Sequence, residues 1–301
     1  MKRGWIVGAV VVALVVACGF WYFRSGKTRP TTVPIPAPAL QSKRAARLPR
    51  PAHVVVIVEE NKSYENIIGN ADAPYLNGLL VRAALFTRSY GVAHPSQPNY
   101  FALFAGRLNV NGDACAVAGI PASAANLGGE LIAAGKSFAG YAEGLPGVGF
   151  TGCTSGHYAR KHAPWTHFSD IPGTDSRPFS AFPKYAALPT LAFLIPNELD
   201  DMHSASIARG DAWLRRNLQP LLDWGARNDA LVVVTWDESS NALTNHIPTL
   251  FIGPMVRPGR YPEIVSHYTV LRTLAGMYGL TPMGASAAAA PISDVWKATA
   301  R

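Results

Sequence analysis

Two short apolar runs in this chain each end in a pair of carboxylates. Residues 54–58 read VVVIV and continue into Glu59, Glu60 and Asn61, and residues 231–236 read LVVVTW and continue into Asp237 and Glu238. Short runs rich in β-branched residues are typical of strands buried on both faces of a parallel sheet. In open α/β sheets, ligands bind at the carboxyl ends of such strands. The pattern therefore predicts two acidic clusters at one edge of a sheet.

Further apolar runs alternate with amphipathic stretches from residue 51 onward, which predicts an α/β fold with a mostly parallel sheet. The expected strands are residues 54–58, 84–90, 137–142, 190–195, 231–235 and 249–252. The expected helices are residues 98–105, 127–134, 207–224 and 268–278, the last closed by Gly279. Residues 143–189 are rich in Gly, Pro, Ser, His and aromatic residues without periodicity, which indicates a functional lid.

The first 27 residues are set apart by their hydrophobicity. An apolar stretch of 19 residues runs from Trp5 to Phe23 with basic residues on both sides, which predicts a transmembrane signal anchor over residues 1–27. The sequence VVAC ending at Cys18 resembles a lipoprotein cleavage site, so acylation of Cys18 is one alternative and secretion is another. A Pro-rich linker over residues 28–50 and a catalytic domain over residues 51–301 would follow.

The positive charge of the chain is confined to its N-terminal part. Residues 1–50 hold nine of the 27 Lys and Arg residues and none of the 19 Asp and Glu residues. Residues 51–301 therefore hold 18 basic and 19 acidic residues, a net charge of −1. A basic surface of the kind that binds nucleic acid is not expected on this domain.

The predicted domain contains two cysteines, Cys115 and Cys153. An even pair is consistent with one disulfide in an oxidising compartment, and two buried thiols are the alternative. We therefore expect the domain to lie outside the cytoplasm, in the periplasm or beyond, tethered to the membrane by its N-terminal anchor.

Ser96 lies in the sequence HPSQPNY, just before the helix that is expected to open near Pro98. A hydroxyl there is close to free backbone N–H groups and to the positive end of the helix dipole, which favours phosphate binding and an activated serine. The alternative is that Ser96 only caps the helix.

Carboxylate and amide oxygens at the ends of the two acidic strands suit a hard divalent cation. The candidate ligands are Glu60, Asn61, Asp237 and Glu238, with Glu59 and Glu65 as nearby alternatives. Adjacent carboxylates are unfavourable unless a cation or a proton neutralises them, which supports the assignment of Asp237 and Glu238. For Glu60 and Asn61, loop solvation and helix capping are the alternative.

Histidines could supply a third chemical group. His203 follows the expected strand 190–195, His162 lies in the irregular segment, and His246 precedes the sequence IPT. Each could coordinate metal, bind phosphate or protonate a leaving group, although a lone histidine is more often a surface or core residue. His94, His157, His167 and His267 rank lower as candidates.

As a set, these motifs resemble the bacterial phosphoesterase family that contains acid phosphatases and phosphatidylcholine-type phospholipases C. The resemblance runs in order through residues 51–296, in VIVEEN at 56–61, HPSQPNY at 94–100, YARKHAPW at 158–165, IPN at 195–197, DMH at 201–203, GDAWL at 210–214, TWDE at 235–238, IPT at 247–249 and HY at 267–268.

This resemblance implies an alkaline-phosphatase-like α/β/α sandwich. It implies Ser96 as the nucleophile and metal ligands among Glu60, Asn61, Ser96, Asp237 and Glu238. The resemblance also implies that His203, Lys161 and His162 are active-site residues. It implies that His246 is an accessory metal ligand or a phosphate contact, and it makes Asp201, Asn99 and His94 further candidates. The metal could be Mg, Ca, Mn or, less readily, Zn.

Together, the residues and the resemblance predict a membrane-tethered, extracytoplasmic acid phosphatase. It would hydrolyse phosphate monoesters, with phosphoinositides among the candidate substrates, through a phosphoserine intermediate and with a divalent metal ion. Three alternatives stay open: a phospholipase C-type phosphodiesterase, a phosphoethanolamine-type transferase, and a surface-binding protein without turnover.

Overall fold

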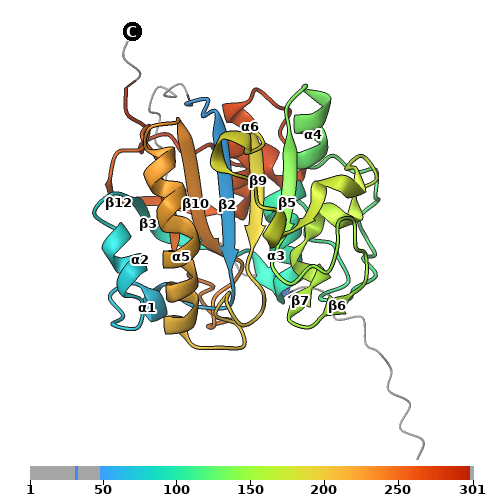
Figure 1. Ribbon diagram of the computed structural model, residues 1–301, viewed down its shortest axis with the longest axis horizontal. Helices are drawn as coiled ribbons and strands as arrows, with labels where there is room; N and C mark the ends of the chain where they lie inside the picture. The colour runs from blue at the N-terminus through green and yellow to red at the C-terminus, as the bar shows by residue number, and fades with distance from the viewer. Residues whose placement is uncertain (1–30, 33–47, 299–301) are drawn as a thin grey trace, which may run out of the picture.

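The structure, a computed structural model, describes residues 31–32 and 48–298, and it shows an eight-stranded sheet covered by helices on both faces (Figure 1). The strand order is β12-β3-β11-β10-β2-β9-β5-β8. These strands are β2 (His53–Glu59), β3 (Ala84–Tyr90), β5 (Phe138–Ala142), β8 (Ser176–Pro178), β9 (Leu191–Ile195), β10 (Ala230–Trp236), β11 (Thr249–Ile252) and β12 (Gly259–Ser266). Within this part of the chain, β11 is the one strand of the sheet that runs antiparallel, so the predicted mostly parallel sheet is confirmed.

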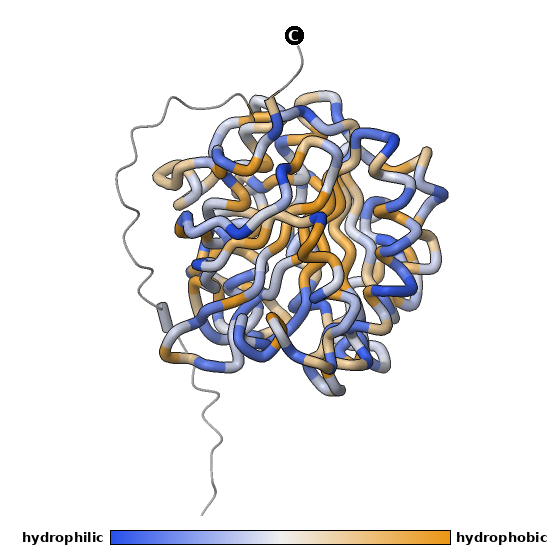
Figure 2. Tube along the Cα trace, turned by 90° about the vertical axis from the view of Figure 1, so that its left-hand side faces the viewer, coloured by the Kyte–Doolittle hydropathy of each residue, from blue (hydrophilic) through white to orange (hydrophobic). Residues whose placement is uncertain are grey.

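The central strand β2 shows why the sheet has two covered faces. Val54, Val56 and Val58 belong to one core cluster, and Val55 and Ile57 belong to the other, with side chains at most 1% exposed. Because successive strand residues point to opposite faces, an unbroken apolar run needs a helical layer on each side. Figure 2 shows the apolar chain concentrated in these central strands.

The two helical layers come from different parts of the sequence. One face carries α1 (Tyr64–Ile67), α2 (Pro74–Leu79) and α5 (Ile207–Gly225). The other carries α3 (Ser96–Ala105), α4 (Leu127–Ala133) and α6 (His267–Met277). Gly279 follows α6 with a φ of +70°, as expected of a helix-terminating glycine.

Most differences from the predicted elements lie at irregular places. The strands β8 and β12 were not predicted, and both lie at the edges of the sheet. In β12 the pairing register shifts between Tyr261 and Ile264, around Pro262, which has no N–H for the ladder. The helix α3 begins at Ser96, two residues earlier than expected, because Pro98 is tolerated anywhere in a first turn.

Two short two-stranded ladders lie outside the eight-stranded sheet. The strand β1 (Thr31–Thr32), from the predicted linker, pairs antiparallel with β4 (Ala93–His94), and β6 (Thr154–Ser155) pairs with β7 (Tyr158–Ala159). No helix within residues 31–32 and 48–298 has the length and apolarity needed to cross a bilayer. The predicted anchor over residues 1–27 lies outside the described residues.

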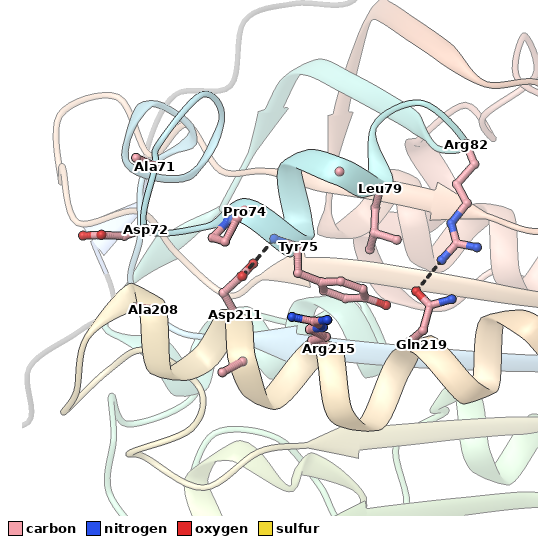
Figure 3. A pocket seen from close by; sticks show the side chains of 12 residues that line it. Ala71, Asp72, Pro74, Tyr75, Leu79, Arg82, Ala208, Asp211, Arg215 and Gln219 are labelled. Atoms are coloured by element: carbon pink, nitrogen blue, oxygen red, sulfur yellow. Dashed lines mark hydrogen bonds between the residues drawn. The ribbon is translucent and has the colours of Figure 1, made fainter.

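Asp211 on α5 joins two helices of the same face (Figure 3). Its carboxylate accepts hydrogen bonds from the backbone N–H groups of Tyr75 (2.9 Å) and Leu76 (2.8 Å), in the first turn of α2. This carboxylate lies in a groove of about 690 Å³ between α2 and α5, where Arg82 also donates to Gln219. The paired polar groups give Asp211 a structural role, although it lies within the motif GDAWL.

We expect Asp211→Ala to lower the free energy of unfolding by about 2 kcal/mol, because two backbone N–H groups, one buried and one partly buried, lose a charged acceptor. Urea denaturation would measure the change. Asp223→Ala is the matched control, since Asp223 lies on the same helix, is 55% exposed and faces Arg82 at 3.8 Å. A loss no larger than that of the control would contradict the capping role.

Candidate active site

The acidic ends of β2 and β10 lie side by side, as the sequence predicts. The strands are parallel neighbours, with Glu59 opposite Trp236 in the register. The backbone N–H of Asp237 donates to the carbonyl of Glu59 (3.1 Å), and that of Glu60 donates to the carbonyl of Asp201 (2.8 Å). Figure 1 shows β2 and β10 ending at the same lower edge of the sheet. The loops after three strands, β2, β9 and β10, therefore meet at one point.

Ser96 is delivered to this point by the first turn of α3. Its Oγ lies 3.5 Å from Glu60 Oε2 and 3.4 Å from Glu238 Oε1, and the residue is 2% exposed. The hydroxyl thus faces the acidic cluster, whereas a capping serine would face the N–H groups of its own helix. The structure therefore brings residues 60, 96 and 238 together, and the catalytic and metal-binding roles assigned to them stay predictions.

Asn61 and His94 link the members of the cluster. The Asn61 side chain donates from Nδ2 to Glu238 Oε1 (2.8 Å), and its backbone N–H lies 3.4 Å from Asp237 Oδ1. His94 Nδ1 lies 2.7 Å from Glu238 Oε2, so this lower-ranked histidine belongs to the site. Asn61 has a φ of +38°, a region that asparagine tolerates better than most residues.

Burial dominates the protonation of these acids. Burial, together with the charges of Glu60 and Glu238, holds the pKa of Asp237 well above its usual range. Burial and the charge of Glu60 raise the pKa of Asp201 to about 9. For Glu60, burial acts to raise the pKa, but His162 and Lys161 outweigh it and leave the pKa lowered. Without a cation, the cluster therefore retains protons that ordinary carboxylic acids would lose.

The unpaired oxygens of this cluster fit a metal ion. Among the described residues, Asn61 Oδ1, Asp237 Oδ2 and Asp201 Oδ2 are buried and have no hydrogen-bond partner. Buried acceptors without donors are unfavourable, and an oxygen-binding cation would satisfy them. The donor set of carboxylates, one amide and one hydroxyl suits Mg²⁺, Ca²⁺ or Mn²⁺.

A second grouping shares one residue with the first. Ligand atoms of Glu60, His162 and Asp201 all lie within 4.8 Å of one another and could also hold a metal ion. The His162 ring stacks on Tyr100, with 5.0 Å between ring centroids, and its Nε2 lies 2.7 Å from Glu60 Oε1. Glu60 belongs to both groupings, which makes it the central residue of the site.

The irregular segment supplies Lys161 as well as His162, both from the 3₁₀ turn Arg160–His162. Burial acts to lower the pKa of Lys161, but the charges of Glu60 and Asp113 outweigh it and leave the pKa raised. The ammonium group therefore stays positively charged beside the carboxylates. The disulfide predicted from the cysteine count joins Cys115 to Cys153, which lies in the irregular segment, with 5.4 Å between Cα atoms.

The remaining candidates lie around the cluster or away from it. Asn99 holds the loop before Ser96, because its Oδ1 accepts from the N–H groups of Val92 (2.9 Å) and Ala93 (3.0 Å). The backbone N–H of His203 donates to Asp201 Oδ1 (2.8 Å), while its exposed ring faces Ser204. The role assigned to His203 remains a prediction.

His246 is not brought to the carboxylates that contact Ser96. Its Nδ1 lies 2.7 Å from Glu65 Oε1, and its ring stacks on Tyr64. Both His246 and Glu65 line a separate polar hollow of about 760 Å³. Glu59 is fully buried at the end of β2, where burial and the charges of Asp201 and Asp200 raise its pKa well above the usual range.

Three residues of the site carried no predicted role, and a fourth, His267, was a lower-ranked candidate. Tyr100 donates to Glu60 Oε1 (2.9 Å), Lys62 donates to the carbonyl of Met202 (2.6 Å), and Asp113 contacts Lys161 (2.9 Å). Buried His267 donates from Nε2 to the carbonyl of Asp237 (2.5 Å), and burial lowers its pKa to about 4. Helical spacing could have identified Tyr100, four residues after Ser96 and hence on the same helix face.

Known proteins are similar to this chain in sequence and in fold. Residues 70–281 match the Phosphoesterase family. The chain is 51% identical to the phosphatidylinositol-3-phosphatase of Mycobacterium tuberculosis over 256 residues, which is 84% of this chain and 85% of that protein. It is 28% identical to an acid phosphatase of Aspergillus fumigatus over 247 residues, which is 75% of this chain. It spans about half the length of the curated fungal relatives, 54% in this case.

Solved structures agree on the architecture. A protein of the alkaline phosphatase superfamily from Vibrio parahaemolyticus aligns with a TM-score of 0.57 and 13% identity, covering 79% of this chain and 69% of that one. The lipoteichoic acid synthase LtaP of Listeria monocytogenes aligns with a TM-score of 0.54 and 12% identity, covering 81% and 76%. These likenesses establish the predicted alkaline-phosphatase-like α/β fold. The match over residues 70–281 and the 51% identity to the mycobacterial relative show that the chain belongs to the Phosphoesterase family and is a phosphoric ester hydrolase.

Proposed function

We propose that the chain is a metal-dependent acid phosphatase that hydrolyses phosphate monoesters through a phosphoserine at Ser96. The observation that carries this proposal is the position of Ser96 Oγ, within 3.5 Å of carboxylate oxygens of both Glu60 and Glu238. A buried hydroxyl at the start of a ten-residue helix, facing two carboxylates, has the surroundings of an activated nucleophile.

The residues of the cluster divide the chemistry between them. A divalent cation held by Glu60, Asn61, Asp237 and Glu238 would supply the positive charge that lowers the pKa of a nearby hydroxyl and neutralises phosphate oxygens. Ser96 Oγ passes its proton to the neighbouring carboxylate of Glu238, 3.4 Å away, and attacks phosphorus in line, and the ester P–O bond breaks as the phosphoserine forms. The Lys161 ammonium and the positive end of the α3 dipole stabilise charge on the phosphate oxygens.

Histidines serve the proton transfers. His162, 2.7 Å from Glu60 and 2% exposed, is our choice for the donor to the leaving oxygen, with His203 as the alternative. Water, deprotonated by the histidine that protonated the leaving oxygen, then attacks the phosphoserine, so that inorganic phosphate leaves and Ser96 recovers its proton from the Glu238 carboxylate.

We further propose that the enzyme acts outside the cytoplasm and that lipid phosphates are among its substrates. The Cys115–Cys153 disulfide supports an oxidising compartment, and the apolar N-terminal sequence supports attachment to the membrane. The name of the mycobacterial relative supports phosphatidylinositol 3-phosphate as a candidate substrate.

A panel of phosphate esters tests this proposal against its nearest alternative. We expect the full chain to release phosphate from p-nitrophenyl phosphate and phosphatidylinositol 3-phosphate at least about tenfold faster than it cleaves bis-p-nitrophenyl phosphate or phosphatidylcholine. A monoester offers one more unesterified oxygen to Lys161 than a diester does, and a charge-assisted hydrogen bond contributes a factor of this size. Faster cleavage of the diesters would favour a phospholipase C-type enzyme.

A further inference from the structure

The proposed function uses the Lys161 ammonium to bind phosphate, but it does not say what holds this side chain in place. Its side chain is 19% exposed, and long lysine side chains have several rotatable bonds, so an isolated ammonium would sample many positions. In the structure, Nζ lies 2.9 Å from Asp113 Oδ2. One specific carboxylate therefore fixes where the charge is presented.

The same carboxylate also contacts the helix that carries the nucleophile. Asp113 Oδ1 accepts a hydrogen bond of 2.9 Å from the backbone N–H of Gln97, the residue next to Ser96. One oxygen of Asp113 thus contacts Lys161, and the other contacts the first turn of α3. The spacing between the Ser96 hydroxyl and the Lys161 ammonium is therefore set through Asp113.

The loop around Asp113 is fastened on both sides. Gln97 Nε2 donates to the carbonyl of Gly112 (3.0 Å) and to that of Ala114 (3.1 Å), the two neighbours of Asp113. The disulfide from Cys115 attaches this loop to the segment that carries Lys161. The Arg160 guanidinium donates to the carbonyl of Cys115 in addition. These contacts hold the carboxylate and the lysine in one rigid arrangement.

We infer that Asp113 is a positioning residue, which holds the Lys161 ammonium where it binds a phosphate oxygen of the substrate attacked by Ser96. This inference rests on the proposed function and adds a residue to it. The ion pair is partly exposed, with side chains 33% and 19% accessible, so it adds little to stability. A cation displaced by about 1 Å, in contrast, has a large effect on catalysis.

The test compares Asp113→Asn with the parent and with Asp175→Asn in full-length protein. Asparagine keeps an acceptor for the Gln97 N–H but loses the charge that binds Lys161. We expect kcat/KM for p-nitrophenyl phosphate to fall about tenfold and the inhibition constant of inorganic phosphate to rise by a similar factor, the usual size for one charge-assisted hydrogen bond. The melting temperature should stay within about 2 °C of the parent.

Asp175→Asn is a matched control, because Asp175 forms a comparable ion pair with Arg177 (3.3 Å) in the same irregular segment. It should leave both constants unchanged. Asp113→Glu, which keeps the charge, should restore part of the loss. Removal of a negative charge by itself would strengthen phosphate binding, so weaker phosphate binding is specific to a misplaced lysine.

A double substitution decides between positioning and a general effect. If Asp113 acts through Lys161, Asp113→Asn should cause no further loss in a Lys161→Met background. A full additional loss there, or phosphate binding as tight as in the parent, would overturn the inference. Failure of the proposed function would look different, because the unsubstituted chain itself would then release no phosphate.

Discussion

Ser96→Ala is expected to lower kcat for p-nitrophenyl phosphate by about a thousandfold or more, because the variant has no hydroxyl to attack phosphorus. Among the hydroxyls near the cluster, Ser96 Oγ is the one within 3.5 Å of both Glu60 and Glu238 in the described residues. Steady-state rates would measure the loss. Mass spectrometry of acid-quenched enzyme would detect the phosphoserine in the parent and not in the variant.

A second buried serine provides the control. Ser89 on β3 is 1% exposed, and its Oγ lies 2.7 Å from Thr249 Oγ1, inside the sheet. Ser89→Ala should lower stability by about 1 kcal/mol and leave kcat near the parental value. Parental turnover by Ser96→Ala would reject Ser96 as the nucleophile, whereas equal losses in both variants would indicate a folding defect.

The strands that build the site could be predicted because their sequences are unambiguous. Residues 54–58 are all β-branched and apolar, residues 231–235 are β-branched except for Leu231, and the two runs form β2 and β10 at the centre of the sheet. Parallel neighbours end at the same edge, so Glu60 and Asp237 had to lie close together once the strands paired. The position of Ser96 required the further recognition that a helix begins beside this edge.

Residues that act through long-range contacts could not be predicted in the same way. Asp113 lies in an irregular loop and meets Lys161 48 residues later in the chain, and His267 meets Asp237 30 residues earlier. Single residues of this kind leave no periodic pattern in the sequence. Sequence spacing likewise failed to indicate that His246 pairs with Glu65 instead of facing the carboxylates near Ser96.

The edges of the sheet were missed for a related reason. The strand β12 is partly exposed and interrupted by a register shift around Pro262, and β8 is three residues long. An edge strand buries little apolar surface, so its residues need not alternate in polarity. Prediction therefore succeeded where burial dictates the residue type and failed where backbone pairing alone defines the strand.

Removal of divalent metal by a chelator is expected to abolish hydrolysis and to lower the melting temperature by about 5–10 °C. A ligand present at a concentration of a hundred times its dissociation constant stabilises the folded state by about 2.7 kcal/mol. For a chain of this length, that free energy corresponds to a change in melting temperature of about 5–10 °C. Activity and thermal unfolding would be measured together, after chelation and after addition of Mg²⁺, Ca²⁺, Mn²⁺ or Zn²⁺ separately. A melting temperature and activity unaffected by chelator would contradict a metal site.

The stabilisation by metal should also grow as the pH rises. Burial and the charge of Glu60 raise the pKa of Asp201 to about 9, and burial holds the pKa of Asp237 above its usual range. The folded, metal-free chain thus binds more protons than the unfolded chain between about pH 4 and pH 9, so its stability falls across this window. A bound cation favours the ionised carboxylates and removes that loss. Thermal unfolding at several pH values, with and without chelator, would measure the difference.

Asp237→Asn tests whether the Asp237 carboxylate causes the pH-dependent stabilisation by metal. The amide is nearly isosteric and carries no charge, so the metal-free variant should be at least as stable as the metal-free parent at pH 8, where ionisation of the buried acid is unfavourable. It should gain little stability from added metal, because a ligand oxygen has lost its charge. Metal response equal to that of the parent would place the cation elsewhere, with the grouping of Glu60, His162 and Asp201 as the next set to test.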